Sequence, residues 1–487
     1  MHLTSLKDRL RVILVCSYWR RTFLQYAPLW SKSSLTGSTD RRSIVTPLEP
    51  AKGSPLDTTI DVFDSLTGDL VLLSPFTQQI KILIVHHASL AQVQELTAAI
   101  AGSVSVNTLN IYDYGGFLSD PVSPSDLMTL PLLRGAVDVK GLSVSTSDPL
   151  LLSHFTLPNL TSFNLWTRGG CEVFPISLLL NFLEGSPSLQ TIHMMIAADL
   201  FYDDVPQDAI LVLPNVKAFA LDINSDSPGY GIAAHISCPS ARTVEFHHQR
   251  QNPTPDILDD ISALSYPWAT IVCQYTTGVI EEIELGLGAT RVGTGTGILI
   301  NQLQLSSSEG ATLTMQYVHR CVQDPDRVGA PLDRRASQAF SQASRKIRDY
   351  PLLANLRHLS IAGGKLLAGD LNLATSDVVE LLGSMELLER FTLKRCDLRP
   401  YLDAFLDTPS SPDAIHRTSF PRIGKFTIVD PVQSFCDDSV YAAAIVRLAK
   451  SQLARGLPFD CMEFYTRVPS SVVEELLLSV NTVDVMS

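Results

Sequence analysis

Charged residues are scarce in this chain of 487 residues: they make up 18% of it, against about 25% in typical soluble domains. The balance is acidic, with a formal net charge of -13, which disfavours binding of nucleic acid through the whole surface. Hydrophobic residues supply 45%, enough to build a core. Residues 1–60 differ, with nine Lys and Arg against four Asp and Glu, so we interpret the N-terminus as a separate segment.

The sequence also lacks an apolar run long enough to cross a membrane, and its early run from Val12 to Cys16 is too short for a secretory signal. Basic residues near the start leave a mitochondrial presequence open as an alternative. None of the eight cysteines forms a C-x-x-C pair, so we expect reduced, mostly buried thiols. These features predict an intracellular protein, cytoplasmic or nuclear, without a membrane partner.

Motifs of catalysis and cofactor binding are missing as well. The run from Gly293 to Gly297 is not G-x-G-x-x-G, and no Lys-Ser or Lys-Thr follows it as in a phosphate-binding loop. His86-His87 and His247-His248 are adjacent residues of predicted strands, so each pair points to opposite faces and cannot easily hold one metal. We therefore expect no enzymatic activity, no cofactor and no metal.

The first thirty residues carry the most specific pattern. Leu10, Leu14 and Val15 fall on one helical face, Trp19 extends it, and Trp30 is a second large apolar anchor. A segment this short cannot bury enough surface to fold alone. It must pack on the next domain, as an ordinary N-terminal helix would, or on a partner. We expect Trp19 to be the main buried anchor, beside Leu14, Val15 and Trp30.

This segment resembles the second half of an F-box, whose helices commonly read D-x-x-x-x-x-x-V-C-x-x-W-R and then P-x-L-W. The matching residues are Asp8, Val15, Cys16, Trp19, Arg20, Pro28, Leu29 and Trp30. The layout is similar to that of F-box proteins abundant in fungi, with the L-P-x-E start of the first helix absent, so residues 1–32 are interpreted as partial F-box helices. An F-box binds the Skp-type adaptor of a cullin ubiquitin ligase. The resemblance implies that the adaptor-binding residues are Leu10, Leu14, Val15, Trp19, Leu29 and Trp30.

Residues 33–60 are predicted to be a linker, because they are rich in Ser, Thr, Pro and Gly. From residue 61 a pattern recurs: an apolar residue, two others, an apolar residue, one other, and an apolar residue. Five copies have a proline two residues before them: Leu160-Phe163-Leu165, Leu189-Ile192-Met194, Val216-Phe219-Leu221, Ala241-Val244-Phe246 and Ile423-Phe426-Ile428. Six more copies start at Ile80, Val106, Val139, Leu356, Leu388 and Phe459.

The last two apolar residues of each copy point to one face of a short strand, and proline suits the start of a strand. Helical stretches lie between the copies; Ile176 to Leu183 is one, and Asp377 is expected to cap another, with Val379 and Leu382 facing inward. Strand and helix at a period near 28 predict parallel strands side by side, with helices on one face.

The pattern resembles a leucine-rich repeat, L-x-x-L-x-L-x-x-N/C-x-L, which Leu388-Phe391-Leu393-Cys396-Leu398 fits fully. The predicted fold class is α/β: a short helical F-box remnant, then an irregular leucine-rich-repeat-like solenoid over residues 61–487. A compact α/β domain is the alternative. Around residues 250–350, Gly and Ser runs separate three strand-like segments, which predicts inserted strands or hairpins.

These features predict a protein-interaction module, the substrate-recognition subunit of a Skp-cullin-F-box type ubiquitin ligase. Its expected partners are a Skp-type adaptor and an unknown protein substrate, with no nucleic acid. The alternative is a scaffold outside the ligase, or a degenerate F-box remnant that no longer binds the adaptor.

Overall fold

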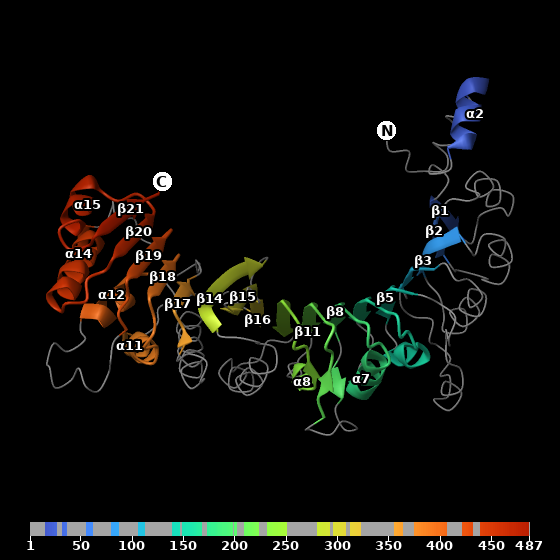
Figure 1. Cartoon of the computed structure of the whole chain (residues 1–487), viewed down its shortest axis with the longest axis horizontal. Helices are drawn as coiled ribbons and strands as arrows, with labels where there is room; N and C mark the ends of the chain where they lie inside the picture. Colours follow the sequence, from blue (N-terminus) through green and yellow to red (C-terminus); the bar gives the residue numbers. More distant parts are fainter. Residues whose placement is uncertain are drawn as a thin grey trace. The chain divides into compact units, whose positions relative to one another are not determined.

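The computed structural model describes the chain in separate ranges (Figure 1). These are residues 15–26, 32–36, 55–61, 79–86, 106–112, 139–146, 149–167, 173–197, 199–201, 209–223, 231–250, 280–292, 296–307, 312–322, 355–363, 375–406, 421–431 and 439–486. The chain divides into two compact units, residues 1–218 and 219–487.

The first unit is a ladder of seven parallel strands, each hydrogen-bonded to the next. In ladder order they are β1 (Lys32–Thr36), β2 (Leu56–Asp61), β3 (Ile80–His86), β4 (Thr108–Tyr112), β5 (Gly141–Thr146), β6 (Ser162–Thr167) and β8 (Thr191–Ile196). The unit's other elements are α2 (Ser17–Gln25), η4 (Pro149–His154), β7 (Val173–Pro175), α7 (Ile176–Glu184), β9 (Asp199–Phe201) and β10 (Leu211–Val212). Strands β7 and β9 form a separate parallel pair.

The second unit combines a parallel ladder with an antiparallel insertion. Its first elements are β11 (Ala218–Ile223), α8 (Gly231–Ala234), β12 (Ile236–Ser237), β13 (Thr243–Arg250), β14 (Ile280–Val292), β15 (Thr296–Ser307) and β16 (Thr312–Val322). Then follow β17 (His358–Ala362), α11 (Thr375–Gly383), β18 (Arg390–Lys394), α12 (Arg399–Leu406), β19 (Lys425–Val429), α14 (Ser439–Ala454), β20 (Cys461–Tyr465), α15 (Ser470–Leu476) and β21 (Thr482–Val485).

The ladder order of the second unit is β13, β16, β15, β14, β17, β18, β19, β20 and β21. Strand β15 runs antiparallel to β14 and β16, so these three strands form a meander. The meander lies between β13, which pairs in parallel with β16, and β17, which pairs in parallel with β14. The strands that the sequence predicts around residues 280–317 are therefore present. Across the described residues the fold is mixed α/β with mostly parallel strands, as the sequence predicts.

The recurring apolar triplets form the core of both units. No side chain of the eleven predicted triplets is more than 4% exposed. Successive strand residues point to opposite faces, so the second and third members of each triplet fall on one buried face. In the first unit the ring of Phe163 packs on Phe182 of α7, with ring centroids 4.6 Å apart. In the second, Phe391 packs on Phe405 of α12 at 5.9 Å and on Phe426 at 5.7 Å.

The prolines lie in turns, a few residues before the strands that the sequence predicts them to start. The amide of Leu160 donates to the carbonyl of Leu157 at 3.1 Å, which makes Pro158 the second residue of a turn. The same bond closes the turns around Pro187, Pro214 and Pro239. Proline fits this position because its ring fixes φ near the value that the turn requires.

A backbone contact also recurs at the start of the strands. Two successive amides of one strand donate to a single carbonyl that precedes the neighbouring strand. The acceptors are the carbonyls of Asn107, Lys140, Thr161 and Gln190 in the first unit, and of Arg357, Glu389 and Gly424 in the second. The repetition visible in the side chains is therefore matched by a repeated backbone geometry.

The helices lie on the buried side of the strands, as Figure 1 shows for α11, α12, α14 and α15 beside β17–β21. Helix α7 begins at Ile176 as predicted. Helix α11 differs in detail: it begins at Thr375, so Asp377 lies inside its first turn instead of capping it. The helix starts three residues earlier than a cap at Asp377 would place it, and Val378 is buried whereas Val379, expected to face inward, is half-buried.

The segment predicted as a linker contains ordered strands at both ends. Residues Lys32–Thr36 and Leu56–Asp61 pair in parallel, and Leu56 is buried. The Ser- and Thr-rich sequence of the first stretch is compatible with a strand, because it has no apolar residues at the spacing of an amphipathic helix. The predicted linker therefore includes strand residues at these two stretches, and the residues between them lie outside the described ranges.

Candidate functional site

The predicted adaptor-binding segment is described from Val15 to Tyr26. Cys16 has an extended backbone, with φ of -160°, and its Sγ accepts a hydrogen bond from the amide of Trp19 at 3.4 Å. Cys16 therefore caps a helix that begins at Ser17. The single helical face expected to join Val15 to Trp19 is not formed, because the cap separates them. Leu10, Leu14, Leu29 and Trp30 lie outside the described residues.

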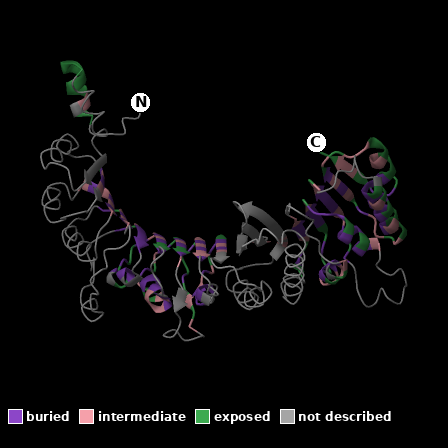
Figure 2. Ribbon diagram, turned by 180° about the vertical axis from the view of Figure 1, so that it is seen from behind, coloured by how far each residue is buried: buried purple, intermediate pink, exposed green. Residues whose placement is uncertain are grey.

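Trp19 is not the buried anchor that the sequence predicts. Its side chain is 45% exposed and stacks on Phe23, with ring centroids 5.5 Å apart. Val15 and Tyr18 are more exposed still. Figure 2 shows α2 as mostly exposed, so its described side chains have little cover from the rest of the chain. None of the described side chains of α2 is buried.

A second surface is the outward face of each ladder, defined as the strand side chains that alternate with the buried triplets. In the first unit, one row of this face runs His86, Tyr112, Ser145, Trp166 and Met195. The rings of His86 and Tyr112 stack, with centroids 5.1 Å apart. Trp166 and Met195 lie opposite each other on β6 and β8, and they are 36% and 41% exposed.

The outward face of the second unit is polar and charged. Its middle row runs Glu284, Ser360, Thr392, Thr427, Glu463 and Asp484. Carboxylates therefore occupy both ends and hydroxyls the middle. Ser360, Thr392 and Thr427 are buried beneath neighbouring side chains, and Ser360 Oγ has no hydrogen-bond partner among the described residues.

Side chains on three strands of this face join in what we call the β14–β18 clasp: Glu282, Glu284, His358, Thr392 and Lys394. His358 Nδ1 lies 3.1 Å from Glu282 Oε1, and its Nε2 lies 3.0 Å from Thr392 Oγ1. Lys394 Nζ donates to Glu284 Oε2 at 2.6 Å. Burial lowers the pKa of His358, which favours a neutral ring. A neutral ring protonated at Nδ1 donates to Glu282 and accepts from the Thr392 hydroxyl.

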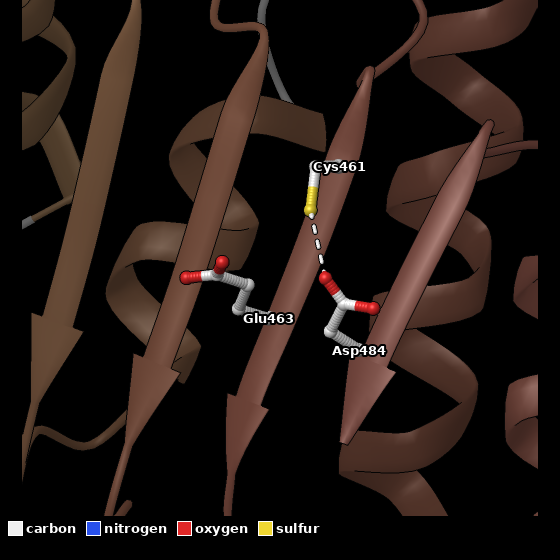
Figure 3. Close-up of side chains that lie close together, drawn as sticks. All are labelled: Cys461, Glu463 and Asp484. Carbon is white, nitrogen blue, oxygen red and sulfur yellow. Dashed lines mark hydrogen bonds between the residues drawn. The ribbon is translucent and has the colours of Figure 1, made fainter. Parts of the chain in front are cut away.

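A thiol and two carboxylates meet at the other end of the face (Figure 3). Cys461 and Glu463 project from β20, and Asp484 projects from β21, with one ligand-type atom of each within 4.8 Å of the others. Lys425 Nζ lies 2.6 Å from Glu463 Oε1, and Cys461 Sγ donates to Asp484 Oδ2 at 3.8 Å. Burial and then the two nearby carboxylates raise the pKa of Cys461, which keeps the thiol protonated.

This trio offers donor atoms that a divalent cation accepts. A cation would have to displace both the thiol proton and the ammonium of Lys425. The arrangement is therefore better described as a hydrogen-bonded acidic cluster, which we call the β21 cluster: Cys461, Glu463 and Asp484.

Sequence reasoning missed both the clasp and the β21 cluster. Glu463 and Asp484 are 21 residues apart, and Glu284 and Lys394 are 110 apart, so no local spacing joins them. The signal that was present is the alternation itself: residues between the triplet members share a face, and the register decides which of them meet. Of the two histidine pairs, His247 Nδ1 lies 3.4 Å from Asp222 Oδ1, and the ring of His86 stacks on Tyr112.

A scan of protein-family models and a search of curated proteins both give no match for this chain. Within the part of the chain that the structure describes, no helix is both long and apolar enough to cross a membrane.

Proposed function

We propose that this chain is a non-enzymatic protein-interaction module whose outward strand faces bind a protein target. The observation that carries the proposal is the pair Trp166 and Met195, opposite each other on neighbouring strands and exposed. Exposure of large apolar side chains to water is unfavourable, and their burial against a partner lowers the free energy of the system. Trp is also among the residues that contribute most to protein interfaces.

The architecture we propose for this function is an irregular leucine-rich-repeat-like solenoid. Three observations support it: the eleven buried triplets, the backbone carbonyl shared by two amides at successive strands, and the Cys396 contact. Cys396 occupies the Asn or Cys position of the repeat pattern, and its thiol donates to the carbonyl of Ile361 on the preceding strand β17 at 3.3 Å. A compact α/β domain would not require each strand to repeat these contacts.

We further propose that α2 docks a Skp-type adaptor, so that the chain is the substrate-recognition subunit of a Skp-cullin-F-box type ubiquitin ligase. The support is the F-box resemblance together with the exposure of Trp19, Tyr18 and Val15. A helix with exposed aromatic side chains gains stability when a partner covers them.

The test is capture of the full chain by an immobilised Skp-type adaptor. Trp19→Ala is expected to weaken capture at least about tenfold, as truncation of a central interface Trp does. The matched control is Tyr465→Ala, which removes an aromatic side chain of similar exposure, 40% against 45%, from β20. Both variants should melt as the parent does, since neither side chain is buried.

Failure of the parent to bind any Skp-type adaptor contradicts the ligase proposal. The alternative then stands: a scaffold, or a degenerate F-box remnant, that still uses the strand face. That alternative predicts a target whose binding is lost with Trp166→Ala and retained with Trp19→Ala.

A further inference from the structure

Strand β21 ends the second ladder and presents one edge without a strand partner among the described residues. It pairs with β20 alone, in parallel register from Cys461 opposite Thr482 to Phe464 opposite Val485. The amides of Thr482 and Met486 donate to the carbonyls of Asp460 and Phe464, at 3.1 Å and 2.9 Å. Bonding residues alternate along a strand, so the N–H and C=O groups of Val483 and Val485 point away from β20.

The two sides of this edge differ chemically. On the outward face, Asp484 stands at the edge with Glu463 directly behind it on β20. Lys425 pairs with Glu463, whereas the described contact of Asp484 is the Cys461 thiol, so Asp484 keeps an unneutralised charge. On the opposite side of the strand are Val483 and Val485, and Val485 is 41% exposed. Leu477 and Leu478, in the turn leading to β21, are 51% and 76% exposed.

These features select a ligand. Exposed strand edges bind extended backbone, because it supplies the missing hydrogen-bond partners. In either strand direction, the ligand residue opposite Asp484 has its side chain on the outward face, about 5 Å away, where a positive charge is favoured. Its two neighbours point to the side of Val483 and Val485, where apolar side chains are favoured.

We propose that the β21 edge binds an extended peptide segment of a partner protein with a basic residue between two apolar ones. The segment adds a strand to the ladder, and its Lys or Arg lies over Asp484. A second copy of this chain fits less well. The symmetric antiparallel pairing that uses the outward groups of both Val483 and Val485 sets Asp484 directly opposite Asp484 of the other copy, and such like-charge pairs are destabilising.

The proposal does not use Trp19, Trp166 or Met195, the residues changed or invoked in the adaptor and strand-face proposals, so failure of those tests leaves it unaffected. The probe is a fluorescently labelled peptide with Ile-Lys-Ile at its centre and Thr on both sides, titrated into the full chain and followed by anisotropy. A second peptide carries Glu in place of Lys. The parent should bind the Lys peptide at least about fivefold more tightly than the Glu peptide. Asp484 attracts the Lys across the strand pair and repels the Glu.

Asp484→Lys should reverse this preference. Glu474→Lys makes the same charge change on helix α15 and should preserve it. If thermal melting shows that Asp484→Lys does not fold, Asp484→Asn replaces it, and the expected result is equal binding of the two peptides.

The strand-addition step has its own test in peptides methylated on single backbone amides. If the added strand is antiparallel, the two Ile amides bond to β21, so their methylation abolishes binding and methylation of the Lys amide does not. If it is parallel, the Lys amide bonds to β21, and the effects are reversed. Undiminished binding of both methylated peptides overturns the proposal, because contact through side chains alone would tolerate them. No binding of the Lys peptide, or a full chain that is dimeric through β21 at neutral pH, overturns it as well.

Discussion

The imidazole Nδ1 of His358 lies 3.1 Å from Oε1 of Glu282, and this contact ties the parallel ladder at β17 to the inserted meander at β14. Burial lowers the pKa of His358, opposed by Glu282 and reinforced by Arg390 and Lys394. The folded protein therefore favours the neutral ring. The stabilisation is complete above the ordinary histidine pKa of about 6.5 and is lost as the pH falls through the lowered value.

Acid should accordingly loosen the β14–β18 clasp. Hydrogen exchange of peptides covering residues 355–363 is expected to speed up between about pH 7 and about pH 5, after correction for intrinsic rates. His358→Gln keeps a polar side chain without a titrating group, so its exchange should change less over this range. Equal pH dependence in parent and variant would show that the ring is not held neutral.

Gly363 is expected to tolerate no side chain. A β-carbon there would lie 2.5 Å from the carbonyl oxygen of Arg395 and 3.1 Å from Cys396 Cα, and both are backbone atoms that cannot move aside cheaply. Gly363→Ala should lower the unfolding free energy of this unit by about 1–3 kcal/mol. Gly383→Ala is the control, since nothing lies within 4 Å of its β-carbon position. At the end of a helix it should be neutral or stabilising by up to about 1 kcal/mol. Urea titrations compare the two.

Removal of the Phe391 side chain is expected to destabilise the second unit's core strongly. It is fully buried and packs on Tyr401, Phe405 and Phe426 at once. Phe391→Ala should cost about 3–5 kcal/mol of unfolding free energy. Tyr465→Ala, at a 40% exposed position on β20, should cost less than about 1 kcal/mol in the same urea titration. Similar losses in the two variants would contradict the packing described here.

The cysteines should differ sharply in reactivity. Burial raises the pKa values of Cys238 and Cys396 to about 12, so almost no thiolate forms near neutral pH. Cys16 is a free thiol and is exposed. Alkylation with iodoacetamide at about pH 8, read by mass spectrometry, should modify Cys16 first and spare both buried thiols until denaturant is added. Rapid labelling of Cys396 in the native chain would count against its hydrogen bond to Ile361.

The interior of the fold was largely predictable. Whether Phe163 or Ile192 is buried follows from a spacing of a few residues, because a strand alternates its side chains strictly. The same spacing predicts the parallel strand pairs, as β6 and β8 confirm. Helix starts were harder to predict, since helix boundaries depend on weak competing contacts. Cys16 caps α2, so Val15 lies outside the helix, and α11 begins at Thr375, before Asp377.

The candidate sites were less predictable than the core. Nothing near Trp166 in the sequence marks Met195 as its neighbour, and nothing near Glu463 marks Asp484. From the sequence alone, the burial of the triplet side chains and the parallel pairing of their strands could be predicted, because both follow from local periodicity and from apolar transfer out of water. Which outward side chains meet could not be predicted in this way, because it depends on the register between strands, set by turns and helix packing many residues away.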